Sequence, residues 1–308
     1  MSKELYKKYR PKKLDQIIGQ NNAVSVLQKK LKHNKIPHSI LLTGPSGVGK
    51  TSIARILRRE LNCGKQDFSE INGADKRGID DARNITRRMN QAPLGGDCRI
   101  WLIDECHRIT SDAMSELLKA LEDTPDHVYF ILATTEPQKL LKTIRTRCMS
   151  LALKPLSDMD IELLISNVSK AEKFKPTKEI KEKIIECSLG SARQALVLLD
   201  KIIKLDNEDE MLDAIQISST ETQAIAIARA LFNFKTKWSD MAKILKATEN
   251  EEPEGVRYLV LAYAKSVLLG GGGLSRRAFI VIEHFRDNFY DSKFAGLVAA
   301  CYEVINSK

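Results

Sequence analysis

Short apolar runs alternate with amphipathic stretches through the first half of the chain. The apolar runs predict five strands, at residues 39–43, 68–71, 100–103, 128–133 and 149–153. Helical periodicity separates them, most clearly at residues 51–61 and 111–121. Strands that are apolar at nearly every position are buried on both faces, as in a parallel sheet between two layers of helices. The pattern therefore predicts an α/β fold with a parallel sheet.

Strand signals fade after Pro155, and the rest of the chain carries helical patterns. They predict helices at residues 156–173, 177–188, 191–203, 222–232, 238–247, 255–269, 276–287 and 294–305. Pro155 and the acidic stretch at 207–210 are plausible boundaries. We therefore expect an α/β domain over residues 1–155, a small helical domain over 156–205 and an all-helical domain over 206–308. Four glycines at 270–273 predict a loose loop, and a hinge there stays open.

Composition narrows the class of protein. The 308 residues are 43% hydrophobic and 29% charged, which is typical of a globular protein and excludes a disordered or collagen-like chain. The net charge is +9, and residues 1–60 alone carry 14 Lys and Arg against 3 Asp and Glu. This excess indicates a polyanionic partner, nucleic acid or a phosphate ligand, although a lysine-rich solvated surface explains it equally well.

Targeting and metal signals are absent from the sequence. No run approaches the roughly 20 apolar residues that span a bilayer, and the charged N-terminus has no apolar signal segment. We therefore expect a cytoplasmic protein with no membrane partner. The six cysteines form no CxxC pair or zinc pattern, so we expect reduced, mostly buried thiols and no zinc: Cys63, Cys98, Cys106, Cys148, Cys187 and Cys301.

A phosphate-binding loop is the sharpest motif. The pattern GxxxxGK[ST] follows an apolar strand and opens a helix, as a P-loop requires. Its backbone N–H groups would cradle phosphates, Lys50 would neutralise the β- and γ-phosphates of ATP, and the Thr51 hydroxyl would ligate Mg²⁺. A chance Gly-rich turn is the weak alternative. The residues are Gly44, Pro45, Ser46, Gly47, Val48, Gly49, Lys50 and Thr51, followed by Ser52.

Two carboxylates end the third apolar run. Asp104 would lie beside Mg²⁺, and Glu105 would orient and polarise the attacking water. Two acids after a strand could also be a solvated turn, but the upstream P-loop disfavours that alternative. The two motifs together predict a hydrolytic P-loop NTPase.

Further segments resemble those of a known family. They are YRP at 9–11, IIGQ at 17–20, EINGA at 70–74 leading into RGIDD at 77–81, IDECH at 103–107, ALED at 120–123, ATTEPQKL at 133–140, RTRC at 145–148 and GSARQAL at 190–196. In this order, over roughly residues 5–203, the chain resembles the ATPase subunits of sliding-clamp loaders within the AAA+ class. The resemblance is closest to the bacterial DNA polymerase III gamma/tau subunit and looser to the replication factor C small subunits.

The resemblance implies roles for matching residues. Arg147, with Arg145 as a rival, matches an arginine that reaches the γ-phosphate of the neighbouring subunit. Thr135 matches the sensor 1 residue, with Thr134 as the fallback, and Arg193 matches sensor 2 on the lid helix. Their alternatives are a surface arginine for Arg147 and a helix-surface salt bridge for Arg193. The segment covering adenine and ribose would be Tyr9, Arg10, Pro11 and Ile18.

Partners follow from the same resemblance. Clamp loaders hold primer–template DNA by its phosphate backbone without reading sequence, in a ring-like oligomer with other loader subunits that we expect to be pentameric. The expected DNA contacts are Arg77, Arg83, Arg87, Thr110 and Ser111, although solvated helix arginines explain the first three as well. Arg88 follows on the same helix and can point elsewhere. The sliding clamp would meet residues 89–96, where Pro93 and Leu94 are apolar.

The chain also departs from the gamma/tau pattern. No cysteines form the zinc module of that subunit, and the sequence ends at residue 308 without a long tail. A phage or other viral loader and a divergent cellular one both fit, and the domains become an ATPase domain, a lid and an oligomerising collar. Two other functions remain open: another AAA+ DNA remodeller, such as a helicase loader or branch-migration ATPase, and a scaffold without catalysis. The helical C-terminal part disfavours the remodeller, and the intact motifs disfavour the scaffold.

Overall fold

The computed structural model describes residues 4–75, 78–249 and 251–307, without the side chains of residues 218–222. The chain divides into two compact units, Met1–Ile203 and Lys204–Lys308, and each is described by itself.

A parallel sheet forms the centre of the first unit. Among the described residues its strands are β1 (Ser39–Thr43), β2 (Cys63–Asn72), β3 (Cys98–Asp104), β4 (Val128–Thr134) and β5 (Met149–Ala152). Their order across the sheet is β2-β3-β4-β1-β5, with every neighbouring pair parallel. The predicted α/β fold is confirmed. Because the strands are parallel, the residues that follow β1, β3 and β4 gather at one edge of the sheet.

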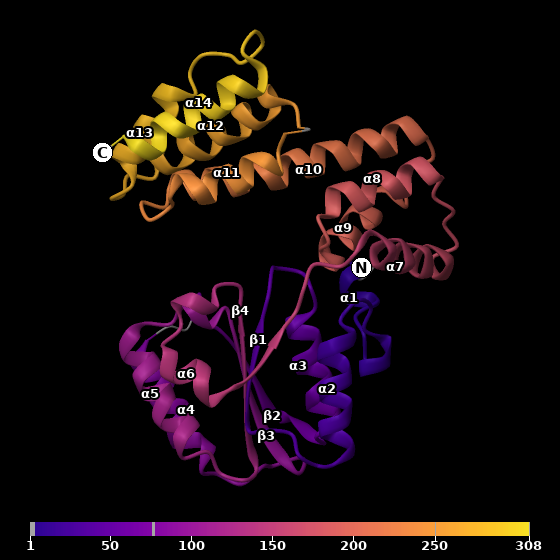
Figure 1. Cartoon of the computed structure of the whole chain (residues 1–308), viewed down its shortest axis with the longest axis vertical. Coiled ribbons are helices and arrows are strands. Elements are labelled where there is room, and N and C mark those ends of the chain that lie inside the picture. The colour runs from indigo at the N-terminus through magenta and orange to yellow at the C-terminus, as the bar shows by residue number, and fades with distance from the viewer. Residues whose placement is uncertain (1–3, 76–77, 250, 308) are drawn as a thin grey trace. The chain divides into compact units, whose positions relative to one another are not determined.

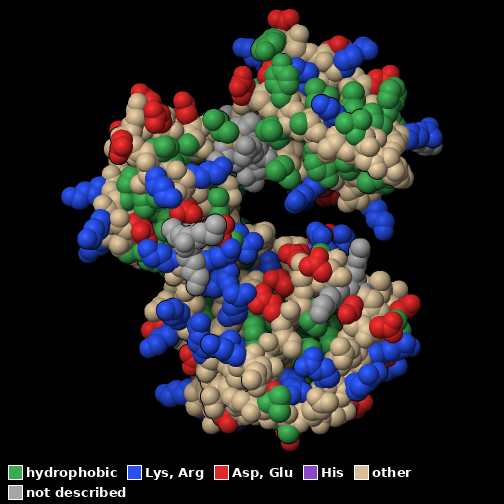
Figure 2. All heavy atoms as spheres, turned by 180° about the vertical axis from the view of Figure 1, so that it is seen from behind, with side chains coloured by type: hydrophobic (Ala, Val, Ile, Leu, Met, Phe, Trp, Pro, Cys, Tyr) green, Lys and Arg blue, Asp and Glu red, His purple; other side chains and the backbone are tan. Residues whose placement is uncertain are grey.

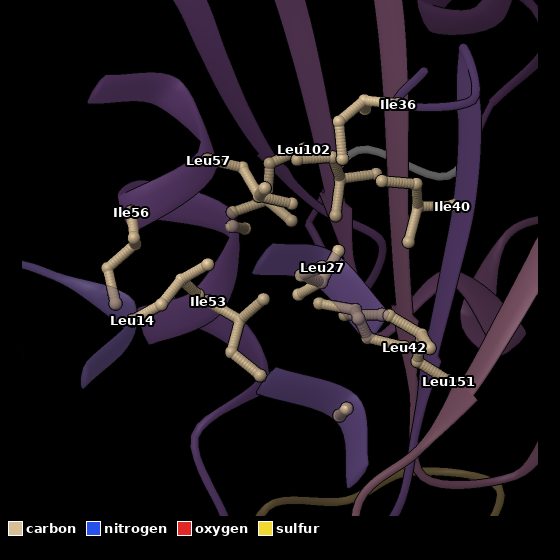
Figure 3. Close-up of a cluster of buried hydrophobic side chains, with 14 of the residues drawn as sticks. Leu14, Leu27, Ile36, Ile40, Leu42, Ile53, Ile56, Leu57, Leu102 and Leu151 are labelled. Atoms are coloured by element: carbon tan, nitrogen blue, oxygen red, sulfur yellow. The ribbon is translucent and has the colours of Figure 1, made fainter. Parts of the chain in front are cut away.

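Helices cover both faces of this sheet (Figure 1). One face carries α2 (Asn21–Lys32) and α3 (Lys50–Glu60), and the other carries α4 (Ile79–Met89), α5 (Ser111–Glu122) and α6 (Lys142–Arg147). On the first face Leu27, Ile53 and Leu57 pack against Ile40 and Leu42 (Figure 3). All five side chains are almost fully buried, so this layer holds the loop after β1 rigidly in place.

Short elements and a helical group complete the unit. The short elements are α1 (Leu5–Lys8) and the single 3₁₀ turns η1 (Leu14–Gln16), η2 (Cys106–Arg108) and η3 (Pro137–Lys139). The group consists of α7 (Asp158–Ala171), α8 (Lys178–Ser188) and α9 (Ala192–Ile202). Ser157, Thr177 and Ser191 cap these helices, each accepting a hydrogen bond from the backbone N–H three residues on. Helix α1 packs against α9.

The second unit is all-helical in its described part. It contains α10 (Glu208–Leu231), α11 (Trp238–Lys246), α12 (Pro253–Leu269), α13 (Ser275–His284) and α14 (Lys293–Asn306) around a core that includes Val260, Val281, Phe285 and Leu297. We expected a helix from residue 222, but α10 begins 14 residues earlier. The acidic stretch is its cap and first turn, where Asn207 accepts from the N–H of Asp209 at 3.0 Å.

None of the helices in the described ranges is both long and apolar enough to cross a bilayer.

Candidate nucleotide-binding site

The loop between β1 and α3 is shaped by its glycines. Gly44, Gly47 and Gly49 have φ angles of 140°, 78° and 109°, which side chains of L-residues disfavour. A Cβ on Gly44 would lie 2.3 Å from the Leu153 carbonyl oxygen, and one on Gly47 would lie 2.0 Å from Ser191 Oγ. The loop therefore approaches both the strand end and the start of α9 as only glycine permits.

Lys50 lies at the start of α3 and is almost fully buried, with 6% of its surface exposed. Its Nζ donates to the carbonyl oxygens of Gly44 at 2.6 Å and Pro45 at 2.7 Å. Burial lowers the pKa of Lys50, and the attraction of Glu105 and Asp104 opposes this effect without cancelling it. The structure thus places inside the P-loop a buried ammonium group whose desolvation the nearby carboxylates offset only in part.

Thr51 and Asp104 meet across the sheet edge. The Thr51 hydroxyl donates to Asp104 Oδ2 at 2.8 Å, which joins the first turn of α3 to the last residue of β3. A hydroxyl and a carboxylate are oxygen ligands that suit Mg²⁺, and Lys50 lies one residue away for the phosphates. The side chains therefore fit the expected metal.

Glu105 has an unusual backbone. Its φ and ψ angles of 49° and 40° lie in the left-handed region, which is uncommon for a residue other than glycine. Its N–H donates to Asp104 Oδ1 at 3.0 Å. Non-glycine residues in this region tend to cluster at functional sites, where the surroundings hold the backbone in place.

The two adjacent threonines at the end of β4 differ in what they contact. Thr135 Oγ1 donates to Glu105 Oε2 at 3.4 Å. Thr134 is fully buried, and its Oγ1 accepts from the N–H of Glu136 at 2.9 Å and lies 3.0 Å from His107 Nδ1. Thr135 is therefore the threonine beside the pocket acid, and Thr134 braces the turn.

His107 had no role in the sequence analysis, although it lies within one of the matched segments. Its side chain is 5% exposed, with Nε2 3.2 Å from a Glu136 oxygen and Nδ1 3.5 Å from Glu105 Oε2. Burial lowers its pKa, against the attraction of the two carboxylates. The imidazole thus lies beside Glu105, and burial favours its neutral form.

Lys50, Thr51, Asp104 and Glu105 line one pocket of the first unit, whereas Thr135 and His107 lie behind Glu105 and are not part of the pocket wall. Its wall combines the N-terminal segment, the P-loop, the end of β3 and the helices after β5. The lining residues are Tyr6, Tyr9, Arg10, Pro11, Gln16, Ile17, Ile18, Ser46, Gly47, Val48, Gly49, Lys50, Thr51, Ser52, Asp104, Glu105, Leu156, Leu164, Ala192, Arg193 and Leu196. Gly44 and Pro45 take part through the carbonyls that hold Lys50. Sequence reasoning missed Tyr6, Gln16, Leu156 and Leu164, because no motif marks them. It also gave no role to Ile17, Ala192 and Leu196, although all three lie within matched segments.

Cations converge in this pocket. Burial lowers the pKa of Arg10, and repulsion by Arg55 and Arg193 adds to the effect. Arg193 also contributes repulsion at Lys50. A pocket with the buried Lys50, the half-buried Arg10 and the exposed Arg193, whose charges repel one another, is suited to a polyanion, whose negative charge would relieve the repulsion. The apolar wall of Ile17, Ile18 and Leu164 can receive a flat ring beside it.

Comparison with known proteins identifies the family. A family model described as "DNA polymerase III, delta subunit" matches residues 19–77 and 66–157. The DNA polymerase III subunit gamma/tau of Mycobacterium tuberculosis is 30% identical over 306 residues, which is 92% of this chain and 50% of that protein. The tau subunits of Bacillus subtilis and Escherichia coli are 32% and 31% identical, over 71% and 74% of this chain. The chain belongs to the AAA+ clamp-loader family. It spans half or less of the length of these curated relatives.

Solved structures agree on the fold of this clamp-loader family member. The branch-migration motor RuvB of Thermotoga maritima superposes with a TM-score of 0.58, covering 79% of this chain and 87% of that one. The sequence identity is 23%, so the likeness shows an AAA+-type fold alone.

Arg147 lies away from the pocket that the same chain forms. It ends α6, ion-pairs through Nη2 with Glu122 and donates from Nη1 to the Thr143 carbonyl at 3.3 Å. Arg145 is exposed on the same short helix. Neither residue lines the pocket, so any contact of Arg147 with a nucleotide must be with one bound to another chain or follow a rearrangement.

The expected DNA contacts fall on α4 and α5, which pack against each other. Arg77 lies outside the described residues. Arg83 and Arg87 are exposed on α4, and Arg83 lies 3.4 Å from Asp80. Thr110 caps α5 by accepting from the N–H of Ala113 at 3.3 Å, and Ser111 is the first residue of that helix. Arg88 instead lies over the Trp101 ring, 5.4 Å from its centroid.

The loop expected to meet the clamp is held from inside the fold. Asp67 accepts from the N–H groups of Leu94 at 2.9 Å and Gly95 at 2.8 Å, and it pairs with Arg99 at 3.0 Å. Both charged partners are almost fully buried, whereas Leu94 is 78% exposed. The buried Asp67–Arg99 pair therefore fixes the loop, and the Leu94 side chain extends from it into solvent.

The basic excess of residues 1–60 is partly explained. Figure 2 shows Lys and Arg side chains gathered on the flank of the first unit that carries α1 to α3. Several stand in last helical turns, where they complement the helix dipole: Lys29, Lys30 and Lys32 in α2, and Arg58 and Arg59 in α3. Only some of the basic residues in this segment therefore line the pocket.

The six cysteines are buried free thiols. Within the described ranges, no cluster of three or more His, Cys, Asp or Glu could hold a metal ion. The expectation of a zinc-free chain stays a prediction.

Proposed function

We propose that the chain is the ATP-hydrolysing motor subunit of a sliding-clamp loader, which opens the processivity clamp and places it on primer–template DNA. The observation that carries the proposal is the 2.8 Å contact between Thr51 and Asp104 beside the buried Lys50. It joins the P-loop threonine to the carboxylate at the end of β3, in a chain similar to DNA polymerase III gamma/tau subunits.

Hydrolysis is assigned to groups around Lys50. Lys50 would exchange its carbonyl partners for the β- and γ-phosphate oxygens, and Glu105 would accept a hydrogen bond from the attacking water and orient it. Thr135, which donates to Glu105, would keep that carboxylate and the water aligned. Bound through Thr51 and Asp104, Mg²⁺ would neutralise charge on the phosphates.

Two arginines would report on the γ-phosphate. Arg193 would contact it from α9 of the same chain, as sensor 2. Arg147 would leave Glu122 and reach the nucleotide of the adjoining subunit, because a guanidinium stabilises charge that develops in phosphoryl transfer. Hydrolysis would then require assembly.

The adenosine end of ATP would lie under the N-terminal segment, against Tyr9, Arg10, Pro11 and Ile18. Residues 1–155 would act as the ATPase domain, 156–205 as a lid and 206–308 as the collar of a ring with other loader subunits, pentameric and cytoplasmic. The supporting observations are the pocket wall, which contains both N-terminal and α9 residues, and the helical second unit.

DNA would lie against α4 and the start of α5. Arg77, Arg83 and Arg87 would pair with phosphates, and Thr110 and Ser111 would offer hydroxyl or backbone N–H groups at the α5 N-terminus. Leu94 on its rigid loop would dock into the clamp. Contacts of this kind position the duplex without reading its sequence.

The test is the steady-state ATPase rate with the clamp and primed DNA, each alone and both together, using the reconstituted loader. Strong stimulation only when both are present supports the proposal. An ATPase indifferent to both contradicts it, and stimulation by branched DNA without a clamp would favour a branch-migration motor, whose fold the chain shares. Arg147→Ala should abolish the stimulated rate, and Arg145→Ala on the same helix tests the rival residue: a rate lost in Arg145→Ala alone would assign the role to Arg145.

A further inference from the structure

Tyr6 is a pocket residue without a role so far. It lies in α1, half-buried, and lines the pocket together with Arg193. Its neighbour Leu5 is 4% exposed and anchors the helix. Helix α1 packs against α9, which carries Arg193. The side chain of Tyr6 is therefore held at the junction between the N-terminal segment and the helix that would sense the phosphate.

Arg193 is held at both ends. Its backbone N–H donates to the Gly47 carbonyl of the P-loop at 3.4 Å. Its guanidinium carbon lies 5.6 Å from the centroid of the Tyr6 ring, within the range of a cation–π interaction. Arg10 and Lys50 repel the guanidinium from within the pocket. The Tyr6 ring is thus an attractive contact for this exposed cation, which shares the ring with Lys7, whose Nζ lies 5.4 Å from the centroid.

Helix α1 has a second attachment on the same side. Lys8 Nζ and the Tyr9 hydroxyl both donate to one carboxylate oxygen of Glu172, the residue that caps the C-terminus of α7. Since α7 and α9 pack against each other, α1 is tied to this helical group at two points. The position of the Tyr6 ring therefore follows the helices that carry Arg193.

We propose that Tyr6 is a positioning residue that sets the preference of the pocket for ATP over ADP, by holding the Arg193 guanidinium where the third phosphate of ATP lies. The inference rests on the proposed nucleotide site. A side chain already confined near its bound position loses less entropy when the phosphate arrives. ADP lacks the group that Arg193 would contact, so the ring affects the two nucleotides unequally.

The experiment compares the dissociation constants of ATPγS and ADP by calorimetry, in Mg²⁺ and with the full chain. Tyr6→Leu removes the ring and should lower the ratio of the ADP constant to the ATPγS constant by about two- to five-fold, the range of an exposed cation–π contact. Tyr6→Phe keeps the ring and should keep the ratio. In an Arg193→Ala background, Tyr6→Leu should leave the ratio unchanged.

Other outcomes overturn the inference. If Tyr6 has only a structural role, Tyr6→Leu weakens the binding of both nucleotides equally and the ratio of the constants stays the same. If Tyr6 has no role, neither constant changes and the ratio again stays the same. Thermal melting checks that each variant folds. If Tyr6→Leu does not fold, Tyr6→Gln is used in its place. If the wild-type chain binds neither nucleotide, the proposed function fails. If the wild-type chain binds both nucleotides and the ratio of the constants does not change in Tyr6→Leu, only this inference fails.

Discussion

Buried cations occur in both units of the molecule, but among the described residues it is the cations of the nucleotide pocket that repel one another. In the second unit Arg257 and Arg277 are 6% and 4% exposed. Arg257 pairs with Glu254 at 2.9 Å and donates to the Phe285 and Arg286 carbonyls, and Arg277 donates to the Leu231 carbonyl at 2.7 Å. Each guanidinium joins the ends of helices, so these charges serve the fold.

In the pocket of the first unit the cations also repel one another. Lys50 is as buried as Arg257 and, like Arg277, donates to backbone carbonyls, but Arg10 and Lys50 both feel repulsion from Arg193. Burial and this repulsion disfavour the charged form of Lys50, and the attraction of Glu105 and Asp104 offsets them only in part. The difference separates cations that join helix ends from cations whose mutual repulsion a bound phosphate would relieve.

Arg147 belongs to neither group of cations. Its replacement should have the largest effect of the variants considered, on the rate of ATP hydrolysis. It is 38% exposed at the side chain and outside its own pocket. Arg147→Ala should lower ATP hydrolysis by about 10³-fold or more, the range of an arginine supplied by a neighbouring subunit. Nucleotide affinity and melting temperature should be unchanged, since an exposed ion pair contributes little to stability. Loss of nucleotide binding instead would mean that the arginine acts within its own subunit.

Glu254→Gln tests the structural side of the comparison. It leaves the buried Arg257 without its carboxylate, which should lower the free energy of unfolding of the second unit by about 3–5 kcal/mol. ATP affinity should not change. Chemical denaturation measures the loss, and Glu303→Gln on the exposed side of α14 should cost no more than about 0.5 kcal/mol. Equal losses in both variants would mean that the buried pair is not structural.

His107 gives the smallest expected effect, through pH. Because burial lowers its pKa in the folded chain, the unfolded chain binds the proton first as pH falls below about 6.5. Stability should therefore fall as pH drops from 6.5 towards the lowered pKa. His107→Asn should make the melting temperature depend less on pH over this window. An unchanged pH profile in His107→Asn would assign the titration to another group.

The sequence anticipates the sheet and the two phosphate motifs because their signals are local. An apolar run followed by glycines and Lys50, and another ended by Asp104, are readable from adjacent residues. Helix α10 was placed too late, since residues 208–221 mix charged and polar side chains without a clear apolar stripe, although Asn207 was an available cap signal. Strand β2 begins at Cys63, ahead of the apolar residues, where its register with β3 is irregular.

Tertiary contacts account for what the sequence could not predict in the site. Tyr6 and Leu164 reach the pocket only because α1 and the helices after β5 fold back over the P-loop. The choice between Thr134 and Thr135 likewise depends on which hydroxyl faces Glu105, a matter of strand twist and turn geometry.

The most direct test of the account is thermal melting of the wild-type chain and of Lys50→Ala, each with and without MgATP. MgATP at 100 times its dissociation constant should stabilise the wild-type chain by about 2.7 kcal/mol and leave Lys50→Ala unaffected. Without nucleotide, the free energy of unfolding of Lys50→Ala should lie within about 1 kcal/mol of the wild-type value, because the cost of burying the Lys50 charge offsets its hydrogen bonds. The exposed control Lys35→Ala should also lie within about 1 kcal/mol of the wild type. A Lys50→Ala chain that is several kcal/mol less stable on its own, or equally stabilised by MgATP, would contradict the account.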